Sequence, residues 1–245
     1  MYDAPAYLWA IIIAGPAAVA MLTCVVLYGG AERAGLGRRR AALLAGGAAV
    51  VVGGWLAASA VIAGHGWYRT LPWFPVAIAG YFGLLLALRR IPVVERALAA
   101  PGRASRLELP HTPRVAGVAF LLYLAFGHLP ALFALPAGLG DIAAGIAAPL
   151  VARKLAQGTG RRAAVWFNAF GITDLVVALT LGALTGFGLL TVNPSSAPIS
   201  ELPLALIPTA TVPLLFALHI TAMSTRANAA RTPQPAIIRF TAAAE

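Results

Sequence analysis

Residues 114–152 read RVAGVAFLLYLAFGHLPALFALPAGLGDIAAGIAAPLVA, and this stretch decides the class of fold. After Arg114 its only charged residue is Asp141. At 1.5 Å per residue, about 39 apolar residues are too many for a single membrane helix. The segment Gly127–Pro130 supplies a natural break, and Pro136 is a competing position for it. The stretch therefore predicts a hairpin of two transmembrane helices.

The composition of the whole chain agrees with a membrane protein. Of its 245 residues, 60% are hydrophobic and 11% are charged, and the mean hydropathy is +0.83. A soluble domain carries about 25% charged residues. We expect an all-α integral membrane protein, a bundle of about seven transmembrane helices that forms a single domain over residues 1–245. The expected spans lie near residues 6–28, 41–63, 71–88, 113–132, 133–152, 163–186 and 202–223.

The basic residues predict the orientation of this bundle. With Arg114 counted at the start of the fourth span, 17 of the 18 Lys and Arg residues fall on alternate loops and Arg69 is the exception. Short loops rich in Lys and Arg are cytoplasmic. The N-terminus is therefore expected outside and the C-terminus in the cytoplasm, after Arg226, Arg231 and Arg239. The net charge of +10 then reflects topology, and we expect no nucleic-acid partner.

The segment 89–112 is expected to be a cytoplasmic loop. Its residues Val93, Val94, Ala97 and Leu98 have the spacing of a short amphipathic helix. Such a helix would lie in the membrane interface, with its basic residues facing anionic head groups.

Two aspartates fall at matching depth inside the fifth and sixth expected spans. Asp141 and Asp174 lie about 12–17 Å into their helices, near the midplane of a 30 Å hydrocarbon core. Charges at this depth are costly and usually serve a function. The pair is expected to share a proton, bind a cation or hold a polar substrate. Gly138 and Gly171 each lie three residues before an aspartate, where a glycine permits close helix packing.

A purely structural interpretation of the aspartates stays open. In that interpretation they link helices through hydrogen bonds, with Thr173 or Tyr123 as partners.

Other polar residues within the spans extend this candidate site. Asn168 and His219 are expected at similar depth near the cytoplasmic ends of their helices, where they can meet; an interfacial position for His219 is the alternative. Pro208 and Pro213 interrupt the seventh span, which places Thr209 beside a broken helix of the kind that lines transporter sites. The candidate substrate or ion site is therefore made of Asp141, Asp174, Asn168, Tyr123, Thr209 and His219.

Cofactor and enzyme interpretations find little support in the sequence. His65 and His128 lie at the outer ends of their spans and are the candidates for an outer-face metal or haem site, but no ligand spacing supports one. We predict no metal and no cofactor. No hydrolase, zinc-protease or phosphate-binding motif is present, so an enzyme is the less favoured interpretation. The only lysine, Lys154, lies at a helix end and excludes a retinal Schiff base.

Two segments resemble a known group of proteins. LPALFALPAGLGD at residues 129–141 and LPLALIP at residues 202–208 are similar to parts of an uncharacterised bacterial family of polytopic inner-membrane proteins with six or seven helices. The resemblance covers about residues 114–219. It implies a multi-pass protein of the bacterial cytoplasmic membrane and carries no function.

Three functions are compatible with these observations. The first is a small-solute or ion permease with the aspartate pair as its midplane site. The second is a non-catalytic accessory or assembly subunit, packed in a homo-oligomer or a larger membrane complex. The third is a histidine-based redox or metal protein. The lipid bilayer is the one partner that all three share.

Overall fold

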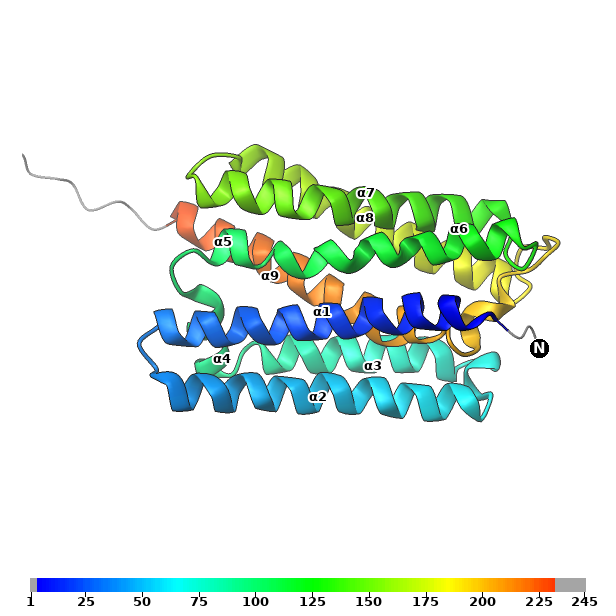
Figure 1. The fold of residues 1–245 in the computed structure, drawn as a ribbon, viewed down its shortest axis with the longest axis horizontal. Coiled ribbons are helices and arrows are strands. Elements are labelled where there is room, and N and C mark those ends of the chain that lie inside the picture. Colours follow the sequence, from blue (N-terminus) through cyan, green and yellow to red (C-terminus); the bar gives the residue numbers. More distant parts are fainter. Residues whose placement is uncertain (1–3, 232–245) are drawn as a thin grey trace, which may run out of the picture.

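The structure, a computed structural model, describes residues 4–231, with side chains up to residue 224. Within these residues the fold is entirely helical, and most helices lie side by side along one direction (Figure 1). Five helical segments are long and apolar enough to cross a membrane, and the bent pair α3 and α4 would make a sixth. The five are α1 (Ala6–Arg33), α2 (Arg38–Gly64), α7 (Ala131–Ala156), α8 (Arg161–Gly186) and Ile207–Ser224.

Shorter elements complete the chain. Helices α3 (Trp73–Leu88) and α4 (Pro92–Ala99) meet at an angle of 81°. The expected amphipathic helix is therefore present as α4, and it packs against α1, where Ala97 contacts Gly30. The remaining elements are η1 (Trp67–Arg69), α5 (Arg103–Arg106), η2 (Leu109–Gly117), α6 (Val118–Ala125), η3 (Ala197–Ser200), η4 (Ile207–Thr211) and α9 (Val212–Arg231).

The helix break in the opening stretch falls between α6 and α7. Helix α6 ends at Ala125 and α7 begins at Ala131, while Pro136 lies inside α7. Gly127 adopts a φ of 75°, a left-handed conformation that glycine takes without steric cost. The chain turns here because glycine and the following Pro130 both end a helix readily.

The prediction of one continuous α-helix over residues 113–132 was wrong. This part of the chain is built from the nine-residue 3₁₀-helix η2, followed by the eight-residue α6. Pro110 and Pro113 lie in η2 and lack the N–H group that an α-helical hydrogen bond requires. A 3₁₀-helix rises about 2.0 Å per residue, so η2 and α6 together cover about 30 Å in 17 residues.

The last helical segment occupies the centre of the bundle. Of the residues of Ile207–Ser224, 72% are buried. In an apolar stretch of the same length in α2, at the periphery, 11% are buried. The segment begins with a single turn of π-helix, η4, which includes Pro208. The interruption expected from the prolines is therefore a π-turn, with α9 continuing after it.

The two ends of the bundle differ in charge. The α1–α2 loop, the α4–α5 region, the α7–α8 loop and the end of α9 lie at one end, on the left of Figure 1. These are the loops in which the sequence gathers its basic residues. Arg239 and the side chains of Arg226 and Arg231 lie outside the described residues. Arg114 was wrongly counted with the loop residues, because it is buried inside the bundle.

Candidate functional site

Four residues spaced three apart lie along η2 and the N-cap residue before it: Glu108, His111, Arg114 and Gly117. In a 3₁₀-helix, with three residues per turn, such residues stand directly above one another. An α-helix would spread them around its circumference, because each step of three residues falls short of a full turn. The 3₁₀ geometry therefore aligns one acid, one imidazole and one guanidinium toward α7, α8 and α9.

These residues meet others from the packed helices in a buried cluster that we call the polar core. Glu108, His111, Asn168 and His219 are completely buried, and Arg114 is 4% exposed. Sequence reasoning missed the first two because they fall in a segment of mixed polarity outside the expected spans. The sequence pattern that could have revealed them is Glu-x-x-His-x-x-Arg-x-x-Gly around two prolines, because a spacing of three residues places side chains on one face of a 3₁₀-helix. The polar core comprises Glu108, His111, Arg114, Asp141, Asn168, Asp174 and His219.

Arg114 binds both predicted aspartates. Its Nε donates to Asp141 Oδ1 at 2.7 Å, and its Nη2 donates to Asp174 Oδ2. The arginine side chain is 1% exposed, and the two carboxylates are 15% and 8% exposed. The aspartates are therefore brought together as expected, and the partner that they share is Arg114. One guanidinium is shared by two carboxylates, so the Arg114–Asp141–Asp174 group has one excess negative charge when both aspartates are ionised.

Glycines permit this approach. A Cβ atom at Gly140 would overlap the carboxylate of Asp174, and one at Gly117 would overlap Asp141. A Cβ at Gly171 would enter the imidazole ring of His219. The glycine expected to allow close packing three residues before Asp174 thus makes room for a histidine ring. Gly138 lies against Leu121 and the carbonyl of Gly117.

Asn168 links His219 to Glu108 and fixes the tautomer of the histidine. Its Nδ2 donates to the carbonyl oxygen of Ala164 at 2.8 Å and to Glu108 Oε1 at 3.0 Å. Because a carbonyl only accepts, the amide oxygen must face the opposite way, where His219 Nδ1 lies 2.9 Å from it. His219 therefore carries its proton on Nδ1, and Nε2 presents a lone pair, 3.4 Å from Arg114 Nη1.

His111 completes the polar core by stacking. Its ring lies over that of His219 with centroids 3.8 Å apart and planes at 22°, and it meets the edge of Phe167 at 5.6 Å. Both of its ring nitrogens are buried and have no hydrogen-bond partner among the described residues. A neutral imidazole has one donor and one acceptor, so both are unsatisfied here.

Thr209 and Tyr123 lie apart from the aspartates. Thr209 Oγ1 is 2.5 Å from Ser59 Oγ, which lies 3.1 Å from the phenol of Tyr68, and Trp55 donates to the Thr209 carbonyl at 2.9 Å. Burial raises the pKa of Tyr68, so this phenol stays protonated. Tyr123 belongs to the large apolar core. Both residues were expected in the site, but Thr209 hydrogen-bonds with Ser59 and Tyr123 packs in the apolar core.

The outer histidines are also separate. His65 ends α2, with its Nδ1 2.8 Å from the carbonyl oxygen of Val61, and His128 lies in the turn between α6 and α7. In the described part of the chain, the side chains that lie close enough together to bind one metal ion are instead Glu108, His111 and His219.

Two small cavities border Asp141. Each measures about 30 Å³, the space of about one water molecule. One is lined by Arg114, Asp141 and Thr211, and the other by Asp141, Pro208 and Leu175. Both are also lined by Ile207, the first residue of the π-turn η4, and by Val212, which follows it. The interrupted helix and the Asp141 carboxylate therefore meet at the same place, as expected for an ion or solute site, although Thr211 and not Thr209 lines it.

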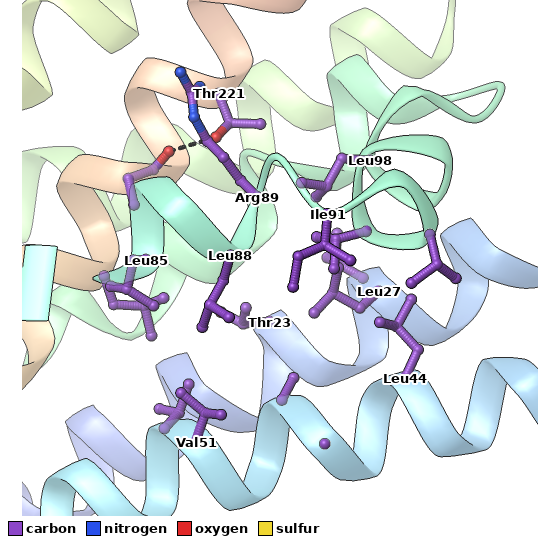
Figure 2. A pocket seen from close by; sticks show the side chains of 18 of the residues that line it. Thr23, Leu27, Leu44, Val51, Leu85, Leu88, Arg89, Ile91, Leu98 and Thr221 are labelled. Carbon is purple, nitrogen blue, oxygen red and sulfur yellow. Dashed lines mark hydrogen bonds between the residues drawn. The ribbon is translucent and has the colours of Figure 1, made fainter. Parts of the chain in front are cut away.

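A larger groove of about 520 Å³ lies elsewhere, between α1, α2, α3, α4 and α9. Figure 2 shows its side chains, which are largely aliphatic, such as Leu27, Leu44 and Ile91. Its charged residues are Arg40 and Arg89. This lining suits acyl chains rather than a charged solute, so the polar core remains the candidate functional site.

These features define the class of protein: over residues 4–231 it is all-helical, with five helices of membrane-spanning length and a buried polar core. By sequence, the chain belongs to the family described as a domain of unknown function, DUF8737, which matches residues 71–225, more than half of its length. The matched range contains every residue of the polar core and leaves out α1 and α2. No curated protein and no solved structure matches the chain.

Proposed function

We propose that the protein is a small-solute or ion permease of the bacterial cytoplasmic membrane, with Asp141 and Asp174 as its ion-binding site. Asp141 is the eleventh residue of the 26-residue α7, and Asp174 is the fourteenth of the 26-residue α8. Both therefore lie near the middle of helices about 39 Å long. The observation that carries the proposal is the single guanidinium of Arg114 shared by two carboxylates at this depth.

The excess negative charge favours a proton or a small cation as the bound species. An uncompensated carboxylate in a low-dielectric interior must bind a positive charge or become neutral. The adjoining cavities have the size of one water molecule each, which suits a proton or a monovalent ion. The π-turn η4 beside them supplies a helix interruption of the kind that lines transport sites.

Stability alone gives a weak reason to keep this ion cluster. Replacing a buried ion pair with apolar residues of similar volume is often neutral or stabilising. Three charged residues on η2, α7 and α8 are therefore better explained by ion binding than by helix linkage.

We propose that seven segments cross the bilayer. The seven are the five long helices, α3 and the combined segment of η2 and α6. The last of these covers about 30 Å, the thickness of the hydrocarbon core. With the basic loops in the cytoplasm, the N-terminus lies outside and the C-terminus inside.

Ion flux in proteoliposomes tests the permease. The purified protein is reconstituted, a membrane potential or a Na⁺ or K⁺ gradient is imposed, and internal pH and cation content are recorded. We expect wild-type flux of protons, Na⁺ or K⁺. The Asp141→Asn and Asp174→Asn variants should each lower the rate about tenfold or more, since losing 1.4 kcal/mol of ion binding lowers affinity tenfold.

Glu201→Gln is the matched control. This carboxylate pairs with Arg69 at 3.0 Å, away from the polar core, so its loss should leave the flux unchanged. Wild-type vesicles that pass none of the three ions would contradict an ion permease. Aspartate variants that aggregate during purification, while Glu201→Gln does not, would support the helix-linking role instead.

One observation favours an accessory or assembly subunit as the second candidate. Gly46, Gly47, Gly53 and Gly54 of α2 have no atom within 4 Å of where a Cβ would stand. Small residues on an exposed membrane helix permit a second helix to pack closely. If this face binds a partner helix, Gly53→Leu should release a second copy or a larger complex, as measured by light scattering of the protein in native lipid discs.

A further inference from the structure

We propose that Glu108, His111 and His219 form a binding site for a divalent transition-metal ion such as Zn²⁺ inside the helical bundle. One ligand atom from each residue lies within 4.8 Å of the others, and all three side chains are completely buried. This site is distinct from the aspartate site, and metal binding does not depend on ion transport.

His111 provides the independent reason to place an ion here. Both of its ring nitrogens are buried without a hydrogen-bond partner in the described part of the chain. Such groups are rare in folded proteins, because each loses its hydration and gains nothing in return. A metal ion would satisfy one of them directly.

His219 is already prepared as a ligand. Its Nδ1 proton is held by Asn168 Oδ1, so Nε2 has a free lone pair, which is the form that binds metals. The contact between this Nε2 and Arg114 is long, at 3.4 Å, whereas Arg114 is held firmly by Asp141 at 2.7 Å. The imidazole can therefore exchange this weak contact for a metal bond.

Asn168 resembles the outer support of known metal sites. It accepts from His219 and donates to Glu108, and so orients two of the three ligands. Groups that hydrogen-bond to metal ligands in this way fix their tautomer and direction. Asn168 is itself anchored to the backbone carbonyl of Ala164 at 2.8 Å.

The donor set selects the class of ion. Two imidazole nitrogens and one carboxylate oxygen suit Zn²⁺ and other divalent first-row metals, whereas Mg²⁺ and Ca²⁺ prefer oxygen ligands. The two imidazole planes are now inclined by 22° and stacked, so binding requires the His111 ring to rotate until its nitrogen faces the ion. The buried carboxylate of Glu108 supplies a negative charge to the ion directly.

Metal titration of the purified full-length protein tests the site. The protein is stripped with a chelator, titrated with Zn²⁺ or Co²⁺, and analysed by elemental mass spectrometry and by the visible spectrum of bound Co²⁺. We expect one ion per chain with a spectrum of nitrogen and oxygen ligands. Bound Zn²⁺ should also raise the thermal unfolding temperature, because it binds only the folded state.

Two variants preserve the packing while removing a ligand. His111→Phe keeps an aromatic ring against His219, and Glu108→Gln keeps an acceptor for Asn168. Each should weaken metal binding about 100-fold or more and abolish the Zn²⁺-dependent thermal shift, without aggregation of the protein. His128→Phe, in the distant α6–α7 turn, is the matched control and should bind like the wild type.

Absence of a stoichiometric ion from the wild type, or equal binding by the two ligand variants, would overturn the site. Loss of binding in His128→Phe would place the metal at the outer end instead. The flux assay separates this inference from the permease, since metal binding is measured in detergent without any gradient.

Discussion

At the scale of single residues, the polar core depends on glycines as much as on charged groups. Arg114 can reach Asp141 and Asp174 only because η2, α7 and α8 approach closely. Gly140 lies against the Asp174 carboxylate. A Cβ atom at Gly145 would lie 2.6 Å from the backbone nitrogen of Val115. Substituting these glycines therefore changes the polar core without removing any polar group.

Gly140→Ala should destabilise the protein by about 1–3 kcal/mol, because the added methyl group must displace a carboxylate that is held by Arg114. Thermal unfolding in detergent measures the effect. Gly53→Ala is the control: it faces open space on α2, and alanine is the better helix former by about 1 kcal/mol. Equal stability changes in the two variants would mean that the Gly140 contact is not tight.

At the scale of elements, η2 determines how the buried polar residues are arranged. Its length of nine residues is unusual for a 3₁₀-helix, which rarely exceeds three or four residues. Pro113 disfavours the α-helical alternative, because its ring would clash with the carbonyl group four residues earlier. The packing of η2 against α7 stabilises the extended form. The alignment of Glu108, His111 and Arg114 follows from this backbone geometry.

The double variant Pro110→Ala/Pro113→Ala should be less stable than the wild type, although alanine is intrinsically a far better helix former. The reason is that an α-helical η2 would turn Glu108 away from Asn168. Pro149→Ala, at an exposed position inside α7, should be neutral or stabilising. Thermal unfolding compares the variants, and a more stable double variant would show that the 3₁₀ form is not required.

At the scale of the whole molecule, the helices separate a basic end from an end with few charges. The α1–α2 and α7–α8 loops share one end, while the connections that follow α2 and α8 lie at the other (Figure 1). In the proposed membrane topology the basic end lies in the cytoplasm, because short loops rich in Lys and Arg are retained there.

Single cysteines in a Cys24→Ser background test this orientation. In intact cells, an impermeant maleimide should label Thr70→Cys and Thr191→Cys. Ala34→Cys and Gln157→Cys should react only after the cells are permeabilised. Reaction of all four in intact cells would contradict the membrane topology, and the reverse pattern would invert it.

The sequence by itself determined that the chain forms long apolar helices, where most of these helices lie, and that Asp141 and Asp174 fall near the middle of two of them. Hydropathy, charge and helix length are local properties, so they can be read along the chain. The break near Gly127 was also visible, because glycine and proline act on their own backbone. The meeting of Asn168 and His219 followed from their similar depth in neighbouring helices.

Only the tertiary structure decided which side chains the buried polar residues contact. Arg114 was counted with the loop residues because it lies at the start of a predicted span, at the end of a segment that contains several arginines. Glu108 and His111 looked solvent-exposed because hydropathy does not register a buried polar group that is satisfied by distant residues. Their burial depends on the 3₁₀ pitch of η2 and on glycines of α7 and α8, and these properties emerge only when the helices pack together.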